Sequence, residues 1–148
     1  MASLDEWIKD LEIRQKKYPK IALKIDDRLA DEMMKDVYPD TEKVSAELKG
    51  NVATAGIKNT KEKWTYHEYG TGIVGSQNPH VSEALSSMEW KYDINEHGEK
   101  GWFYPKGDGT FGWTKGLPAS KKFWQALQKA EEAFPEIARE ELLREVGR

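Results

Sequence analysis

A glycine-rich segment lies at the centre of this chain: Tyr66-His67-Glu68-Tyr69-Gly70-Thr71-Gly72-Ile73-Val74-Gly75-Ser76-Gln77-Asn78-Pro79. Gly70, Gly72 and Gly75 spell G-x-G-x-x-G, a pattern that in dinucleotide-binding proteins closes a strand and opens a helix holding the pyrophosphate. Pro79 breaks any helix that starts here, and no βαβ run rich in Val, Ile or Leu surrounds the glycines. We therefore interpret the glycines as a sharp backbone turn that needs positive φ or the close approach of another chain.

The composition favours one domain without redox or nucleic-acid chemistry. The 148 residues contain no low-complexity spacer, so we expect a single domain over residues 1–148. The absence of cysteine excludes a disulfide framework, a thiolate nucleophile and a zinc–thiolate site. The 23 basic and 26 acidic residues are interspersed and give a net charge of −3, which is not the footprint of a nucleic-acid-binding surface. We expect no sequence-specific nucleic-acid partner.

Hydropathy gives no sign of a membrane partner. Residues 1–6 lack the basic region and the apolar run of a signal peptide. No apolar stretch approaches the roughly 20 residues that span a bilayer. We expect no targeting segment and no membrane association.

The first residues carry the signals of a helix start. Ser3 and Glu6 match the capping box, in which each side chain accepts a hydrogen bond from the backbone N–H of the other residue. Apolar residues then recur on one helical face, at Leu4, Trp7, Ile8 and Leu11. Pro19 removes a backbone donor and crowds the preceding turn, so we expect this helix to end or kink near Tyr18.

Two further helices are predicted, which makes residues 1–50 helical. One runs from about residue 20 to 37 and has the apolar stripe Ile21, Ile25, Leu29 and Met33. The other is short, is capped by Asp40 or Thr41, and runs through Leu48. Gly50 then occupies the C-terminal position that favours left-handed geometry.

Residues 51–114 are predicted to be β-rich. A weak strand is expected over 51–58 and a second over 63–69, for which one turn of helix is the alternative. Residues 76–87 are expected to form a loop. Three aromatic segments predict further strands, joined by turns rich in Gly, Asn and Pro: residues 89–94, 101–104 and 110–113.

The last segment, residues 115–148, returns to helical spacing. Its apolar stripe consists of Phe123, Ala126, Leu127, Ala130 and Phe134. Pro135 is expected to restart the helix at a first turn, and the stripe then continues to Val146. The order of elements predicts an α+β fold with N-terminal helices, a small antiparallel β-sheet, and a C-terminal helix packed on the sheet.

No arrangement typical of catalysis or metal binding is present. His67, His80 and His97 are far apart, whereas metal sites usually show short spacings. On the predicted strand, His67 and Glu68 point to opposite faces and do not share a pocket. The serine after Gly75 lacks the G-x-S-x-G context of a nucleophile. We expect no metal, no cofactor and no enzyme activity.

Aromatic residues are concentrated in the second half of the chain. Three interpretations stay open for them: a sheet core packed against helices, a protein interface, or a stacking platform for sugars or bases. Burial in a core is the interpretation we favour, because large aromatic side chains are mostly buried. The residues are Trp90, Trp102, Phe103, Tyr104, Phe111 and Trp113.

The order of the motifs resembles a family of tailed-bacteriophage proteins. Glu68-Tyr69-Gly70-Thr71-Gly72 resembles the E-[FY]-G-T-G signature of the HK97-type neck or tail-completion proteins. Further motifs agree in order: Gly75, Asn78-Pro79-His80, Trp90-Lys91-Tyr92-Asp93, His97-Gly98, Gly101-Trp102-Phe103-Tyr104 and Thr114-Lys115-Gly116-Leu117-Pro118-Ala119. The resemblance covers roughly residues 60–135. One segment departs from the family, because Pro39 and Thr41 are not followed by the Thr-Gly pair that the family often carries there.

The resemblance implies a non-enzymatic virion protein of the head–tail junction. It implies two kinds of partner, other copies of the chain in a ring and neighbouring head-connector or tail-tube proteins. It also implies location in the tail or neck of a virion, after synthesis in the cytoplasm of a bacterial host. The alternative function is a carbohydrate- or cell-wall-binding module that uses exposed aromatic side chains.

The candidate site follows from the same residues. The defining turn consists of Glu68, Tyr69, Gly70, Thr71 and Gly72, and the candidate contact anchors are Trp102 and Tyr104. We hypothesise that Glu68 accepts hydrogen bonds from the N–H groups of the turn or from a neighbouring subunit. The alternative is that these residues only fix a tight loop.

Overall fold

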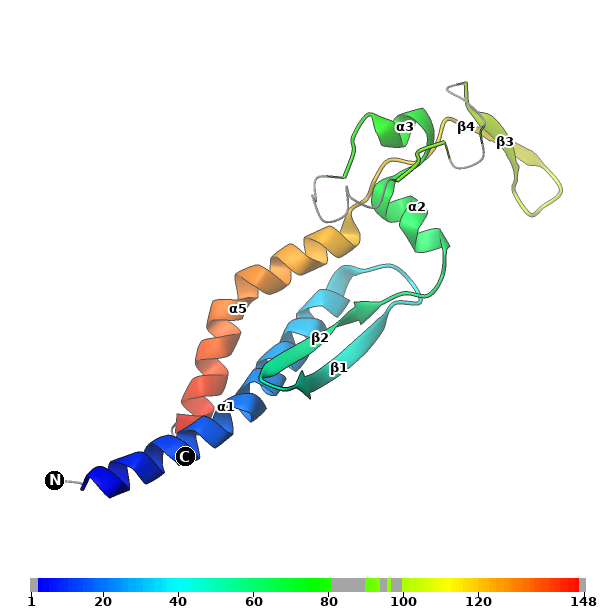
Figure 1. Ribbon diagram of the computed structural model, residues 1–148. Helices are drawn as coiled ribbons and strands as arrows, with labels where there is room; N and C mark the ends of the chain where they lie inside the picture. Colours follow the sequence, from blue (N-terminus) through cyan, green and yellow to red (C-terminus); the bar gives the residue numbers. More distant parts are fainter. Residues whose placement is uncertain (1–2, 81–89, 94–95, 97–99, 147–148) are drawn as a thin grey trace. The chain divides into compact units, whose positions relative to one another are not determined.

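The computed structural model describes residues 3–80, 90–93, 96 and 100–146 (Figure 1). The chain has the predicted α+β composition and divides into two compact units. The first unit consists of residues 1–59 and 126–148, and the second of residues 60–125. A single domain over the whole chain stays a prediction.

The first unit begins with helix α1 (Leu4–Met33), which a 3₁₀ turn, η1 (Met34–Asp36), extends. The predicted capping box is confirmed, with the Glu6 N–H donating to Ser3 Oγ and the Ser3 N–H donating to Glu6 Oε2. The helix end predicted near Tyr18 as one of two outcomes is wrong, because α1 runs through Pro19 as one helix. Buried Ile21 and Ile25 follow Pro19 directly, and their packing offsets the hydrogen bond that the proline removes.

Helix α5 (Lys122–Val146) contributes most of its length to this unit. Ile137 of α5 packs with Ile21 and Ile25 of α1, and partly buried Leu29, Ala133 and Ala138 surround this core. Arg28 of α1 donates to Glu140 at 2.7 Å and to Glu141 at 2.8 Å, so ion pairs lie beside the apolar contact. The predicted restart at Pro135 is wrong, because α5 continues through that residue. The core residues Ala133 and Ile137 flank the proline and hold the helix on both sides.

A β-hairpin completes the first unit. Strands β1 (Glu42–Lys49) and β2 (Val52–Lys58) pair antiparallel, and both contact α1. The predicted strand over 51–58 is confirmed, but the predicted short helix through Leu48 is wrong. Gly50 has the expected left-handed geometry, at φ +61°, in the two-residue turn of the hairpin rather than at a helix end. Pairing with β2 and contact with α1 override the weak local helix signal.

The second unit contains α2 (Lys63–Tyr69) and α3 (Gly72–Ser76). The strand predicted over 63–69 is therefore wrong. Trp64 stacks on Phe123 with ring centroids 4.7 Å apart, and Glu68 is buried one helical turn further on. This i, i+4 spacing places both residues on one helical face. Packing of that face stabilises a helix here, although the loosely alternating sequence suggested a strand.

A second hairpin, β3 (Trp102–Pro105) and β4 (Phe111–Thr114), confirms the strands predicted near 101–104 and 110–113. The strand predicted over 89–94 is wrong for residues 90–93, which form no strand, and its ends lie outside the described residues. The predicted loop begins after α3 and is confirmed for residues 77–80, while 81–87 lie outside the described residues. Among the described helices, none is long and apolar enough to cross a membrane.

The core of the first unit gives a direct test of this packing. Ile137→Ala removes a side chain that is only 5% exposed, so we expect the free energy of unfolding to fall by about 2 to 5 kcal/mol. Leu143→Ala on the same helix, where the side chain is 59% exposed, should change it by less than about 0.5 kcal/mol. Chemical denaturation followed by circular dichroism measures both. Equal losses would show that Ile137 is not a core residue.

Candidate functional site

The predicted turn reverses the chain between two helices of the second unit. Gly70 ends α2 with φ +79°, and its N–H donates to the Tyr66 carbonyl at 3.0 Å. Thr71 is extended, and Gly72 begins α3 with φ +61°. Both glycines adopt a left-handed backbone that other residues reach only at a cost, so the prediction of a positive-φ turn is confirmed.

The turn is paired with a segment more than forty residues away. The Thr71 N–H donates to the Leu117 carbonyl at 2.9 Å, and the Leu117 N–H donates back to the Thr71 carbonyl at 3.1 Å. The hydroxyl of Thr71 also accepts from the Leu117 N–H at 3.0 Å. The Val74 N–H donates to the Lys115 carbonyl at 3.3 Å. We call residues 70–75 and 115–117 together the backbone clamp.

The glycines of the clamp are required because the two backbones touch. A Cβ at Gly75 would lie 2.6 Å from the Gly70 carbonyl carbon, and a Cβ at Gly70 would lie 2.8 Å from the Leu117 oxygen. At Gly72 and Gly116, a Cβ would overlap the carbonyls of Lys115 and Thr71, respectively. The close approach that the sequence predicts is therefore made by the chain's own segment 115–117.

Glu68 is completely buried and caps helix α5. One carboxylate oxygen accepts from the Phe123 N–H at 2.9 Å, and the other accepts from the Trp124 N–H at 3.0 Å. These N–H groups lie in the first turn of α5, where no carbonyl of the helix can accept them and where the helix dipole favours negative charge. His80 Nε2 is 3.0 Å from the same carboxylate. Glu68 thus accepts backbone hydrogen bonds, as we hypothesised, but from α5 rather than from the turn.

Next to Glu68, the Tyr69 ring packs against two other rings. Tyr69 stacks on Trp90 with centroids 4.9 Å apart and lies 5.3 Å from the His80 ring. Trp90 is half-buried, and its indole N–H donates to the Gly70 carbonyl at 2.9 Å. Burial raises the pKa of the Tyr69 hydroxyl, and the charge of Glu68 adds to this rise. Trp90 therefore serves the interior of the second unit.

On the hairpin β3–β4, in contrast, aromatic side chains are exposed to solvent. Its register pairs Phe103 with Trp113 and Pro105 with Phe111, so all four side chains lie on one face. Phe103 is 69%, Phe111 68% and Trp113 51% exposed. The Phe103 and Trp113 rings meet edge to face, with centroids 4.7 Å apart and planes at 70°. We call these four residues the hairpin face.

The two predicted anchors lie on the other side of the hairpin. Trp102 is half-buried, and the ring of Tyr104 covers Gly112, which has no room for a Cβ beneath it. The favoured interpretation, burial of the aromatic residues in a core, is wrong for Phe103, Tyr104, Phe111 and Trp113, whose side chains are all exposed. The signal that identifies Phe103, Phe111 and Trp113 is their alternation with Tyr104 and Gly112 in paired strands.

The described histidines take structural roles. The His67 carbonyl accepts from the Ser120 N–H at 2.7 Å and from the Ser120 hydroxyl at 2.9 Å. His80 is enclosed beside Glu68, with 4% of its side chain exposed. His97 lies outside the described residues. Within the described part of the chain, no group of three or more His, Cys, Asp or Glu side chains is placed to hold a metal ion.

Comparison of the chain with protein-family models, with curated proteins and with solved structures finds no match. The likeness to phage neck proteins therefore rests on the sequence motifs alone. Of these motifs, Gly70 to Gly72 and Lys115 to Leu117 meet in the structure, as the backbone clamp.

A pair of glycine substitutions tests the clamp. Gly116→Ala and Gly107→Ala both place a Cβ at a positive φ, of +108° and +84° respectively. Only Gly116 meets another backbone, whereas nothing lies within 4 Å of a Cβ at Gly107. We expect Gly107→Ala to cost about 1 to 2 kcal/mol from backbone conformation alone, and Gly116→Ala to unfold the second unit. Near-UV circular dichroism on heating measures both. Equal shifts in Tm would contradict the clamp.

The cap is tested by Glu68→Gln. An amide has one acceptor oxygen in place of two, so one N–H at the start of α5 loses its partner, at a cost of about 1 to 3 kcal/mol. Amide hydrogen exchange read by NMR should accelerate at Phe123 or Trp124. Glu62→Gln, at an exposed residue beside α2, is the matched control and should leave both amides unchanged. Unchanged protection in Glu68→Gln would show that the carboxylate is not the cap.

Proposed function

We propose that the protein is a non-enzymatic structural component of a phage or prophage virion, which joins or terminates the tail at the head–tail junction. It does so by self-assembly into a ring and by contacts with head-connector or tail-tube proteins. Its place is the virion, after synthesis in the bacterial cytoplasm. The observation that carries this proposal is the exposed hairpin face.

The hairpin face has the character of a contact surface. Contiguous exposed apolar residues mark sites where proteins meet, and aromatic side chains are enriched in such sites. A two-stranded hairpin is at best marginally stable in water. Phe103, Phe111 and Trp113 are therefore best explained as side chains that a neighbouring protein covers.

The motif residues support the proposal through their position. Strand β4 ends at Thr114, and the next three residues belong to the backbone clamp. At the start of β3, Gly101 has φ +90°, and a Cβ there would overlap the Thr114 carbonyl. The residues that carry the phage resemblance thus fix the base of the hairpin that presents the aromatic face.

A carbohydrate-binding module is the second candidate, because exposed aromatic rings also stack on sugars. The geometry of the pair argues against it. Phe103 and Trp113 stand at 70° to each other, so they do not form one flat platform. An edge-to-face pair can instead fill a pocket in a partner protein.

A pull-down with matched variants tests the proposal. Tagged full-length protein is co-expressed with the virion structural genes that neighbour its own gene, and recovered proteins are identified by mass spectrometry. We expect connector or tail-tube proteins with the wild type and a loss of at least tenfold with the double variant Phe103→Ser, Trp113→Ser. Leu143→Ser, which removes an equally exposed apolar side chain from α5, should recover them normally.

Two results would contradict the proposal. One is recovery of no virion protein by a wild-type chain that is folded by circular dichroism. The other is equal recovery by the wild type and the hairpin variant. Quenching of tryptophan fluorescence by oligosaccharides, abolished by Trp113→Ser, would instead support the carbohydrate-binding alternative.

A further inference from the structure

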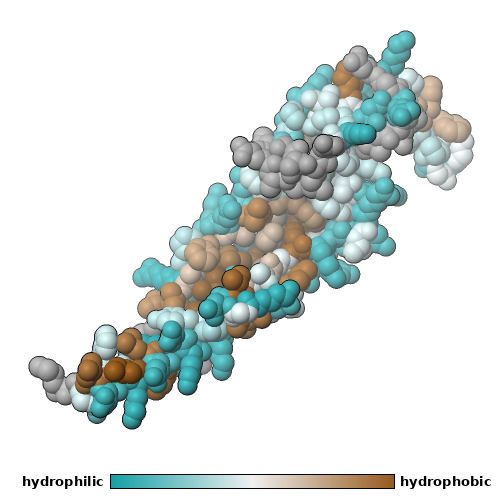
Figure 2. Space-filling view, viewed as in Figure 1, coloured by the Kyte–Doolittle hydropathy of each residue, from teal (hydrophilic) through white to brown (hydrophobic). Residues whose placement is uncertain are grey.

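A groove of about 430 Å³ lies between strand β2 and helix α5 in the first unit. Helix α1 packs against both elements, so its residues Leu29, Ala30 and Met33 form the floor. On the α5 wall, Leu127 is 41% and Phe134 49% exposed. Figure 2 shows apolar residues gathered over the region where these elements lie. The groove is therefore largely apolar and open to solvent.

Strand β2 has a free edge at this groove. The hairpin turn has two residues, so Lys49 and Val52 form the closing hydrogen-bonded pair, and such pairs alternate along antiparallel strands. The N–H and C=O groups of Ala53 and Ala55 therefore point away from β1, and both residues line the groove. Within the part of the chain that the structure describes, these groups have no backbone hydrogen-bond partner. A further strand can pair with them.

The two edges of the hairpin are protected to different degrees. Edge strands commonly avoid unwanted pairing through bulges, charged side chains or proline. The β1 edge has a bulge between Val44 and Glu47, and the Ala46 N–H donates to an Asp27 carboxylate oxygen at 3.5 Å. Strand β2 has no charged residue before Lys58 and no proline. This difference indicates that the β2 edge is the one that accepts another strand.

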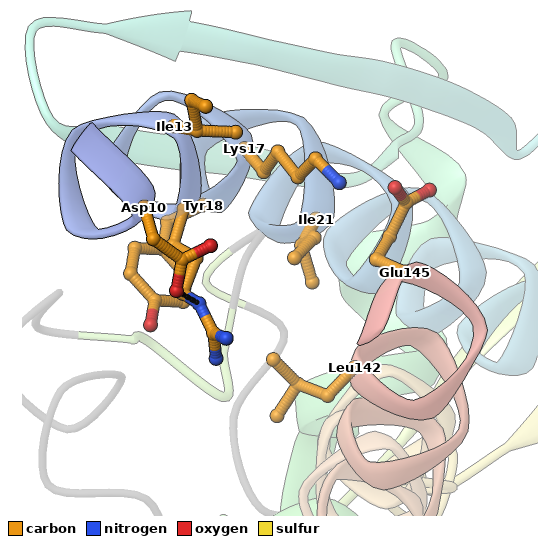
Figure 3. Close-up of a pocket in the computed structure, with 8 residues that line it drawn as sticks. Asp10, Ile13, Lys17, Tyr18, Ile21, Leu142 and Glu145 are labelled. Atoms are coloured by element: carbon orange, nitrogen blue, oxygen red, sulfur yellow. Dashed lines mark hydrogen bonds and ion pairs between the residues drawn. The ribbon is translucent and has the colours of Figure 1, made fainter. Parts of the chain in front are cut away.

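Two other hollows of the first unit contain carboxylates that are paired within the chain. In the hollow of about 230 Å³ between α1 and the end of α5, Asp10 pairs with Arg14 at 2.7 Å (Figure 3). In the hollow beside β1, Asp27 pairs with Lys43 at 2.8 Å. The charges of these two hollows are therefore satisfied without a ligand.

The carboxylates in the groove beside β2 differ from these. Asp26 and Glu131 both line it, and among the described residues neither has an ion-pair or hydrogen-bond partner. Asp26 is half-buried, and burial raises the pKa of its carboxyl, whereas Lys43 lowers the pKa of Asp27. No Lys, Arg or His is among the described residues that line the groove. A partly buried carboxylate without a partner is unfavourable, and a basic side chain entering the groove offsets that cost.

We propose that this groove binds an extended peptide segment of another protein, which adds to the free edge of β2 as a third strand. The side chains of that segment that face α1 and α5 are apolar, except for one Lys or Arg that pairs with Asp26 and Glu131. The free backbone groups of β2 require an extended partner, and the two unpaired carboxylates require a basic one. The site lies within the first unit and does not depend on a virion role.

A synthetic strand tests the site in the full-length chain. The probe is the peptide acetyl-Thr-Val-Thr-Lys-Thr-Val-Thr-amide, whose Val and Lys side chains share one face when it is extended. NMR titration should give a dissociation constant of about 100 µM, as for a small transient contact. At saturation, amide exchange at Ala53 and Ala55 should slow at least tenfold, because their N–H groups donate to the added strand. The same peptide with Glu in place of Lys should bind at least tenfold more weakly.

Two variants separate the backbone contribution from the charge contribution. Ala55→Pro removes an N–H that points away from β1, so it weakens the added strand and leaves the hairpin pairing in place. Asp26→Asn keeps the shape of the side chain and removes its charge. Each should weaken binding of the lysine peptide at least fivefold. Glu12→Gln removes one negative charge from an exposed residue of the same helix, outside the groove, and should have no effect.

Three results would overturn the proposal: no binding of the lysine peptide at 1 mM, equal binding by Asp26→Asn and the wild type, or unchanged amide exchange at Ala53 and Ala55. Equal binding by a folded Ala55→Pro variant would show that the peptide docks without strand pairing, which also contradicts the proposal. Far-UV circular dichroism checks the fold of each variant. If Ala55→Pro unfolds, the exchange data and Asp26→Asn still decide the question. Failure here removes the groove alone, because the hairpin face belongs to the second unit and is tested by its own variants.

Discussion

The second unit depends on the contact between two backbones, at Thr71 and Leu117. Their reciprocal hydrogen bonds bring together segments that are 46 residues apart in the sequence. Around this pair the two backbones approach so closely that a Cβ at Gly70, Gly72 or Gly116 would overlap a backbone atom, which explains why glycines surround it. Because the clamp also joins the end of β4 to the start of α3, it positions the hairpin as well as the helices.

Glu68 adds an electrostatic constraint to this steric one. A buried carboxylate is costly unless its oxygens are hydrogen-bonded, and here both oxygens receive backbone N–H groups. The same bonds determine where α5 begins, since those N–H groups have no partner within the helix. Within the motif Glu-Tyr-Gly-Thr-Gly, Glu68 caps α5 and Gly70 ends α2. Thr71 and Gly72 contact the segment 115–117. These demands explain the motif physically, whatever family the chain belongs to.

The sequence predicted those parts of the fold whose causes are local. The capping box at Ser3 and the aromatic hairpin β3–β4 depend on neighbours within a few residues. The segment 42–49, predicted as helix, forms a strand, and the segment 63–69, predicted as a strand, forms a helix. Both segments are short, and contacts with distant parts of the chain decide their secondary structure. The role of Glu68 as a helix cap could not be predicted from the sequence either, since its partners are 55 and 56 residues away.

The hairpin face is too small to hold a stable complex by itself. If a partner covers roughly 100 Å² on each of Phe103, Phe111 and Trp113, the gain is about 7 kcal/mol. Association costs on the order of 4 to 15 kcal/mol in lost freedom of motion. One hairpin contact is therefore near balance, whereas a closed ring repeats the contact while each added subunit is held by two neighbours. For the proposed ring we therefore expect a chain that remains dissociated in dilute solution and assembles when a template raises its local concentration.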